Sequence, residues 1–247
     1  MHDLQAAVAG GLCIPSLREP QLLQRGVDET QYERTQCRWV DNVVFMGMGE
    51  PLHNCEQVMR AVGLLTHPKG RAMAARRITV STSGVVPAIT RLMTHTGVHL
   101  ALSLNATTDE VRARMMPVNR KWPLQQLLDC CRALPLAKRR RITFEYVLLA
   151  GVNDSLQDAG RLVRLLADLS HCRVNLIPFN PHPLSHFQRP AREDVLAFQR
   201  LLLHKGINVF IRRTRGDDVD AACGMLGGKT LQQARQKSSL PVLSHSS

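Results

Sequence analysis

Four short segments of the sequence place glycine or polar residues directly after apolar, β-branched runs. They are 47–50 (Gly-Met-Gly-Glu), 81–84 (Ser-Thr-Ser-Gly), 103–105 (Ser-Leu-Asn) and 180–181 (Asn-Pro). Glycines let a backbone approach a ligand, hydroxyl and amide groups form hydrogen bonds, and the carboxylate of Glu50 can accept them from an ammonium group. Each segment alone is more often an ordinary tight turn. Together they predict a site for a small polar molecule.

Such a site needs a scaffold that brings the segments together, and the hydrophobic pattern predicts one. Apolar runs alternate with stretches whose apolar residues recur every three or four positions, as in an α/β protein. Ser155 is placed to cap the fourth helix, and Pro123 suits the first turn of the third. We expect strands at 42–46, 77–80, 98–104, 142–149, 173–178 and 207–212, and helices at 55–65, 86–93, 124–134, 156–169 and 195–204. The polar segments then fall at the carboxyl ends of parallel strands, the active face of an α/β barrel.

The charge of the chain indicates a polyanionic partner. Thirty-two Lys and Arg oppose 20 Asp and Glu, which gives a net charge of +12. Basic residues cluster at 76–77, 120–121, 138–141 and 212–215. One such cluster is commonly a solvated loop, but several clusters with this net charge favour nucleic acid. The aromatic content of 4% argues against a module that stacks single-stranded bases on rings.

The cysteines and apolar runs indicate the compartment. Cysteines stand at 13, 37, 55, 130, 131, 172 and 223, with no C-x-x-C pair, so neither a zinc ribbon nor a dithiol redox pair is predicted. No apolar stretch reaches the roughly 18 residues of a membrane helix, and the first thirty residues show no signal-peptide pattern. We therefore expect a cytoplasmic protein with no membrane association and no metal-ligating set of its own.

Five segments resemble one enzyme family. They are GMGEPL at 47–52, RITVSTSGVVP at 77–87, ALSLNA at 101–106, EYVLL at 145–149 and RTRGDDVDAACG at 213–224. All are similar to the radical S-adenosylmethionine enzymes that methylate carbon 2 of adenine in ribosomal and transfer RNA, the RlmN/Cfr family. The resemblance spans about residues 42–226. It implies an α/β fold of the partial (β/α) barrel type, with an N-terminal segment 1–37, a barrel core 38–226, and a C-terminal helix and tail 227–247.

The resemblance also implies a set of site residues. Gly49 and Glu50 correspond to the pair that holds the methionine end of S-adenosylmethionine. Cys223 corresponds to the cysteine that is methylated on sulfur and passes a one-carbon unit to RNA. Asn105 stands where the family commonly has histidine. The remaining cofactor contacts implied are Ser81, Ser103, Leu104, Asn105 and Asn180.

One family feature is absent from the sequence. Radical cleavage of S-adenosylmethionine needs a 4Fe-4S cluster held by a C-x-x-x-C-x-x-C run, and none is present; Cys13 and Cys37 are too far apart to replace it. We therefore expect a barrel that is missing its first strand and cluster loop. An active member would take ribosomal and also transfer RNA as substrate, with an electron donor such as flavodoxin, and we expect a monomer.

Three function classes stay open at this stage. The first is the RNA methyltransferase itself, and the second is a non-catalytic remnant that binds RNA or S-adenosylmethionine. The third, argued without the resemblance, is an ordinary α/β barrel enzyme that acts on a phosphorylated substrate. It ranks last because Glu50 and Glu145 are isolated carboxylates rather than an acid/base pair at the strand ends.

Overall fold

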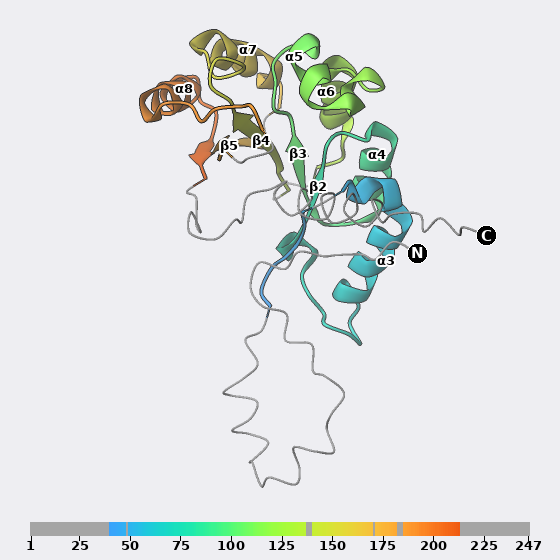
Figure 1. The fold of residues 1–247 in the computed structure, drawn as a ribbon. Helices are drawn as coiled ribbons and strands as arrows, with labels where there is room; N and C mark the ends of the chain where they lie inside the picture. The colour runs from blue at the N-terminus through green and yellow to red at the C-terminus, as the bar shows by residue number, and fades with distance from the viewer. Residues whose placement is uncertain (1–39, 48, 137–139, 170, 182–184, 213–247) are drawn as a thin grey trace, which may run out of the picture.

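A six-stranded parallel sheet forms the centre of the protein in the computed structural model, which describes residues 40–47, 49–136, 140–169, 171–181 and 185–212. The strands lie in the sheet in the order in which they occur in the chain, and each neighbouring pair is parallel (Figure 1). They are β1 (Val43–Phe45), β2 (Ile78–Thr82), β3 (His99–Ser103), β4 (Ile142–Leu148), β5 (Cys172–Pro178) and β6 (Val209–Ile211). This sequential parallel order is that of a partial (β/α) barrel, as expected from the sequence.

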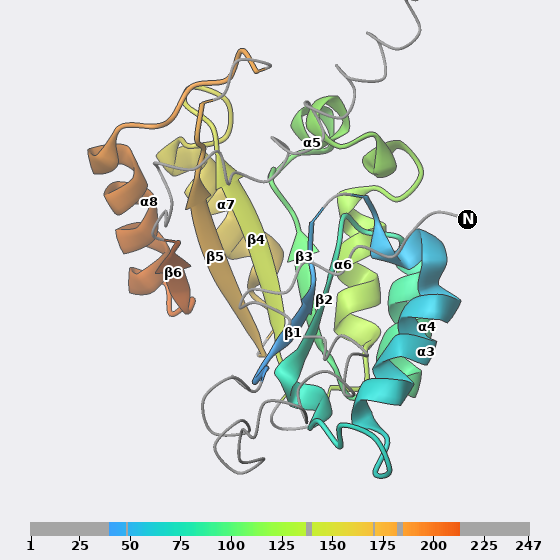
Figure 2. The same ribbon diagram turned by 60° about the horizontal axis from the view of Figure 1, so that its bottom comes forward.

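Helices connect consecutive strands and pack against the sheet (Figures 1 and 2). The α-helices are α3 (Cys55–Thr66), α4 (Val86–His95), α5 (Asp109–Met115), α6 (Leu124–Ala133), α7 (Leu156–Leu166) and α8 (Arg192–His204). Three 3-10 helices, η2 (Pro51–Asn54), η3 (Ala75–Arg77) and η4 (Pro117–Arg120), lie in the connections. Among the described residues, no helix is long and apolar enough to cross a membrane.

The two faces of the sheet carry different residues because side chains alternate along a strand. On β2, Ile78 and Val80 are fully buried, whereas the alternate positions, Thr79 and Ser81, are partly exposed. On β4, Phe144 and Tyr146 have no exposed surface, and Glu145 between them points to the other face and is 8% exposed. The apolar positions pack beneath the helices. The alternate positions leave hydroxyl and carboxyl groups for the open face.

Local signals explain most element boundaries. The side chain of Ser155 caps α7 by accepting a hydrogen bond from the Asp158 N–H at 3.1 Å, as predicted. Pro123 is the N-cap of α6, one position before the first turn in which it was expected. The predicted strands and helices are present with ends shifted by up to three residues.

Helix α5 was not predicted: it has seven residues, and its central Arg112 is buried although charged. The Thr108 side chain begins this helix by accepting from the Val111 N–H at 3.4 Å.

Segments 1–37 and 227–247 lie outside the described residues, so the division of the chain into three parts stays a prediction.

Candidate cofactor site at the strand ends

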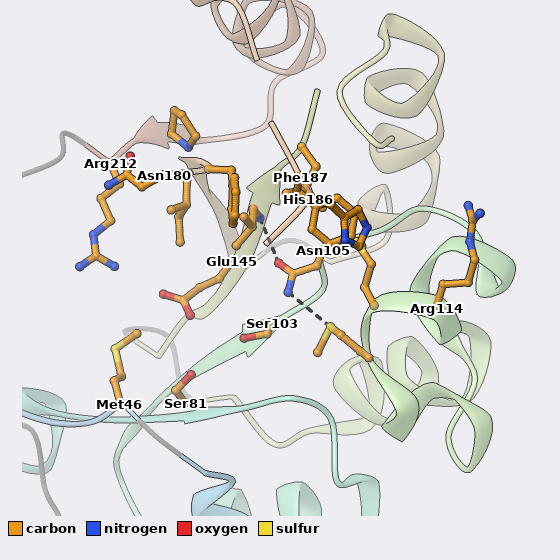
Figure 3. A pocket seen from close by; sticks show the side chains of 18 residues that line it. Met46, Ser81, Ser103, Asn105, Arg114, Glu145, Asn180, His186, Phe187 and Arg212 are labelled. Carbon is orange, nitrogen blue, oxygen red and sulfur yellow. Dashed lines mark hydrogen bonds between the residues drawn. The ribbon is translucent and has the colours of Figure 1, made fainter. Parts of the chain in front are cut away.

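Two adjoining hollows open at the carboxyl ends of the strands. The larger has a volume of about 670 Å³ and extends from β1 to β6, and the smaller, of about 490 Å³, lies over the loops after β1 and β2. Both are lined by Met46, Gly47, Ser81 and Ser103, so they form one continuous space. Figure 3 shows Ser81, Ser103 and Glu145 facing this space. A cavity of this size is typical of small-molecule sites.

The structure brings most of the expected cofactor residues to this space. Gly49 and Glu50 line the smaller hollow, and Asn105 and Asn180 line the larger one. Leu104 lines neither: its side chain is fully buried, its N–H donates to the Glu145 carbonyl at 2.9 Å, and its carbonyl accepts from Arg112. Cys223 lies outside the described residues.

Glu50 joins the loops after β1 and β2. One carboxylate oxygen accepts the Leu52 N–H at 3.0 Å, and the other accepts both the N–H and the hydroxyl of Ser83 at 2.6 Å. A carboxylate has about four acceptor positions, so about one is left for a ligand. The neighbouring Gly49 has φ 85°, in the left-handed region, and a Cβ there would meet no other atom. Its glycine is therefore required by backbone conformation and not by crowding.

Asn105 connects the ends of β3 and β4. It has φ 58°, a left-handed conformation that asparagine tolerates better than most residues. Its side-chain oxygen accepts the Val147 N–H at 3.0 Å, and its backbone carbonyl accepts from the Asn153 side chain at 2.7 Å. The side-chain nitrogen contacts the Met116 sulfur at 3.3 Å. The side chain thus holds the loop in place as well as lining the cavity.

Asn180, just after β5, carries an unsatisfied polar atom. Its side-chain oxygen is buried and has no hydrogen-bond partner, and it is the sole such side-chain atom among the residues that the structure describes. Buried polar atoms are nearly always paired, so an exception needs an explanation. Because Asn180 lines the larger hollow, a hydrogen-bond donor on a bound molecule supplies one.

Glu145 and a group of aromatic and basic residues complete the walls of the larger hollow, although the sequence did not predict them as site residues. Burial raises the pKa of the Glu145 carboxyl, opposed by the charge of Arg212 and a hydrogen bond from Asn175. His186 and Phe187 have ring centroids 4.3 Å apart and line the larger hollow near Asn105 (Figure 3). The signal for Glu145 was a lone carboxylate at an alternate position of an apolar strand, whereas His186 and Phe187 lie in an irregular loop without periodicity.

The described residues offer a place for a polar cofactor but none for an iron–sulfur cluster. Among them, no three His, Cys, Asp or Glu side chains are grouped so as to hold a metal ion. Cys55 and Cys131 are buried in the core, and burial raises the pKa of the Cys131 thiol to about 12. Cys13 and Cys37 lie outside the described part of the chain.

Comparison with known families decides the relationship. The family model described as the Radical SAM superfamily matches residues 27–166, more than half of the chain. The chain belongs to the radical SAM superfamily. The strand-end cavity therefore lies on a sheet of the radical SAM type.

Several curated relatives and solved structures are similar to this radical SAM chain. "Dual-specificity RNA methyltransferase RlmN" of Geobacter sulfurreducens is 55% identical over 190 residues, which are 77% of this chain and 52% of the relative. The protein of the same name from Sorangium cellulosum is 54% identical over 187 residues, 75% of this chain and 48% of the relative. The chain thus spans about half the length of the curated relatives that it matches.

The fold similarity agrees with this relationship. A radical SAM methyltransferase from Sphaerobacter thermophilus superposes with a TM-score of 0.73 and 46% identity, over 79% of this chain and 57% of the other. A domain of pyruvate-formate lyase-activating enzyme from Bacteroides vulgatus gives a TM-score of 0.54 at 20% identity, over 70% of this chain and 99% of the other. The second likeness shows the fold alone.

Proposed function

We propose that this protein provides the S-adenosylmethionine- and RNA-binding part of an RNA adenine-C2 methyltransferase of the radical SAM class. The observation that carries the proposal is the 55% identity over 190 residues to a protein named dual-specificity RNA methyltransferase RlmN. The strand-end cavity supports it, because the polar side chains expected of such a site line one space.

The residues present fit S-adenosylmethionine. Gly49 and Glu50 would hold its methionine end, where the open acceptor position of Glu50 suits an ammonium group. The unpartnered oxygen of Asn180 would accept a hydrogen bond from the cofactor. Ser81, Ser103 and Asn105 would complete the contacts. Leu104 would contact the cofactor through its backbone alone, whose N–H and carbonyl are already hydrogen-bonded to Glu145 and Arg112. When bound, S-adenosylmethionine supplies the methyl group and the radical chemistry of the class.

Cys223 is the proposed methyl carrier. Its support is the motif at 213–224, which resembles the segment that carries this cysteine in the family. The thiolate is the nucleophilic form of the side chain. The thiolate would accept a methyl group on sulfur and pass the one-carbon unit to carbon 2 of adenine.

The proposed partners follow from the same class. RNA, ribosomal and also transfer RNA, would be the substrate, and a reduced protein such as flavodoxin the electron donor. The net charge of +12 supports an RNA partner. We propose a monomer that works in the cytoplasm. The described residues do not fit a 4Fe-4S cluster.

A hybrid enzyme tests the proposal. The part of the Geobacter sulfurreducens relative that precedes the matched region would be joined in frame to this chain, and the RNA digested and analysed by mass spectrometry for 2-methyladenosine. We expect methylation by the hybrid, its loss in Cys223→Ala, and its retention in the control Cys172→Ala. A hybrid that carries an intact cluster and never methylates adenine contradicts the proposal, as does a fully active Cys223→Ala hybrid.

A non-catalytic remnant that binds S-adenosylmethionine or RNA is the second candidate. The observation in its favour is that the 247 residues contain no C-x-x-x-C-x-x-C run. The hybrid enzyme separates the two. Methylation of adenine by the hybrid would count against the remnant. A hybrid that carries an intact cluster, binds S-adenosylmethionine and RNA, and never methylates adenine would favour it.

A further inference from the structure

Arg112, at the centre of α5, is a charged side chain with no exposed surface. Its guanidinium makes four hydrogen bonds: to the carbonyl of Leu104 at 2.9 Å, to the side-chain oxygen of Asn119 at 2.9 Å, and to the carbonyls of Ser83 and Ser103 at 2.6 and 3.0 Å. None of these acceptors is a carboxylate. Burial lowers the pKa of Arg112 to about 10, against the opposing charge of Asp109, so the side chain stays charged at neutral pH.

A buried cation held by neutral acceptors lowers the stability of the fold, because no opposite charge in contact offsets the free energy of its desolvation. Three of its acceptors are the carbonyls at the carboxyl ends of β2 and β3, directly beside the candidate cofactor cavity. A guanidinium is a rigid, planar fork with five donors, and it can bind several carbonyls at once where an ammonium group cannot. The guanidinium therefore fixes the ends of β2 and β3 relative to each other, and we call Arg112 with these carbonyls the clamp.

Ser83 links this clamp to Glu50. Its carbonyl accepts from Arg112 at 2.6 Å, while its N–H and hydroxyl hold one Glu50 oxygen at 2.6 Å. Displacing Arg112 therefore frees the residue that orients the Glu50 carboxylate. Gly84 allows the approach: it has φ 118°, and a Cβ there would lie 3.3 Å from the Arg112 guanidinium and 3.2 Å from the Leu127 methyl groups.

The connection after α5 holds the clamp from the other side. Asn119, which accepts from Arg112, donates to the Asp109 carboxylate at 2.8 Å. The same carboxylate oxygen accepts the Leu124 N–H at the start of α6 at 2.8 Å. The buried guanidinium thus has a fixed position set by three consecutive elements.

We propose that Arg112 is a positioning residue for cofactor binding: it fixes Ser83, and through Ser83 the carboxylate of Glu50. The inference rests on the proposed function in one respect, that Glu50 contacts S-adenosylmethionine. Arg112 itself is buried and lines neither hollow.

Calorimetric titration of S-adenosylmethionine into the full chain tests the proposal. Arg112→Lys keeps the charge and loses the fork, and we expect it to weaken binding at least tenfold. If the lysine variant does not fold, Asn119→Ser replaces it: it removes the amide that accepts from Arg112 and donates to Asp109, and it should weaken binding severalfold. Leu162→Ala, a truncation in the core on α7, is the matched control: it should lower Tm and leave affinity within about twofold.

Three further measurements separate positioning from simple stabilisation. Millimolar methylguanidinium added to Arg112→Ala should restore part of the lost affinity, and Arg112→Lys should speed hydrogen exchange at the Ser83 amide. In a double-mutant cycle, Arg112→Lys should weaken binding much less when Glu50→Gln is already present.

The possible failures are distinguishable. A wild-type chain that does not bind S-adenosylmethionine overturns the proposed function and this inference with it. A wild-type chain that binds, with Arg112→Lys folded and binding equally well, overturns only the role of Arg112. Additive effects of Arg112→Lys and Glu50→Gln overturn the route through Ser83.

Discussion

Glu50 shows how a single side chain joins two strand ends. It accepts the Leu52 N–H within its own loop and both donors of Ser83 in the next one. Hydrogen bonds to an ionised acceptor are roughly twice as strong as neutral ones. The carboxylate therefore holds the loops after β1 and β2 together and still offers about one position to a ligand.

Glu50→Gln should weaken S-adenosylmethionine binding about ten- to a hundredfold, the equivalent of about 1.5–3 kcal/mol for a hydrogen bond to a charged group. A glutamine has one acceptor oxygen where two are used, so the Leu52 or the Ser83 donor also loses its partner. Titration calorimetry measures the change. Glu56→Gln, which alters an exposed carboxylate paired with Arg91, is the matched control and should bind like the wild type.

Asn180→Ala should separate affinity from stability. Its side-chain oxygen has no protein partner to lose, so thermal unfolding should change little. Loss of one hydrogen bond to the cofactor, about 0.5–1.5 kcal/mol, should weaken binding about two- to tenfold. Paired measurements of Tm and affinity check this. A fall of many degrees in Tm with unchanged affinity would assign Asn180 to the fold and not to the ligand.

The residues that sequence reasoning identified are those that mark strand ends. Gly49 and Glu50 follow an apolar run directly, and their position alone brings them to the cavity. Arg112 gave no such signal, because a charged residue in a short helix is normally exposed and its acceptors are backbone carbonyls that every residue has. Leu104 was expected to contact the cofactor, and its side chain lies in the core.

At the scale of elements, short apolar runs were enough to predict the six strands of the described part of the chain. Apolar residues spaced by three or four positions were enough to predict five of its six α-helices. Helix α5 was missed because seven residues span only two turns and offer few apolar positions. That connection nevertheless carries Arg112, whose buried guanidinium is held by Asn119 of the same connection and by Ser83, which is 29 residues away in the sequence. Contacts of this kind arise only once the strands are assembled, so local pattern does not reveal them.

The start of α7 is joined to the loop after β3 by a buried carboxylate. Asp158 accepts hydrogen bonds from Ser155 in its own cap, from Thr107 at 2.7 Å and from Arg161. Burial acts to raise the pKa of Asp158, and the three hydrogen bonds outweigh it and hold the pKa below its usual value. The ionised form is therefore more stable in the folded protein than in the unfolded one.

Asp158→Asn should lower the free energy of unfolding by about 1.5–3 kcal/mol at neutral pH, the range for hydrogen bonds to a charged group. Since the pKa is lowered by folding, this stabilisation is complete above the unfolded pKa of about 3.9 and is lost as pH falls through the folded pKa. Denaturant unfolding from pH 7 to pH 3 should show the difference from wild type shrinking below about pH 4. A difference that grows with acidity would contradict the assigned pKa direction.

At the scale of the whole molecule, positive charge gathers beside the cavity. Arg114 lines the larger hollow and points away from its centre (Figure 3). Arg120 and Lys121 are exposed, at the end of η4, which packs against α5. A net charge of +12 attracts polyanions, and RNA is the polyanion that we propose as partner. Electrostatic binding of this kind depends on salt, because each neutralised phosphate releases counterions.

Reversing Arg114, Arg120 and Lys121 to Glu should weaken RNA binding and flatten its salt dependence. Each lost phosphate contact changes the slope of log K against log salt by about 0.7 for a single strand, so three contacts change it by about 2. Fluorescence anisotropy at several salt concentrations measures the slope. The control reverses Arg60, Lys69 and Arg76, which are exposed on α3, after α3 and on η3. Equal effects of the two triple variants would show that net charge, and not this surface, binds RNA.

Hydrogen exchange with and without S-adenosylmethionine tests the central claim most directly, because it reports where on the chain the cofactor binds. We predict that the cofactor slows exchange in the loops after β1, β2, β3 and β5, at Glu50, Ser83, Asn105 and Asn180, and leaves the amino-terminal ends of the strands unchanged. Protection confined to other parts of the chain, or no protection at saturating cofactor, would contradict the assignment of the strand-end cavity as the S-adenosylmethionine site.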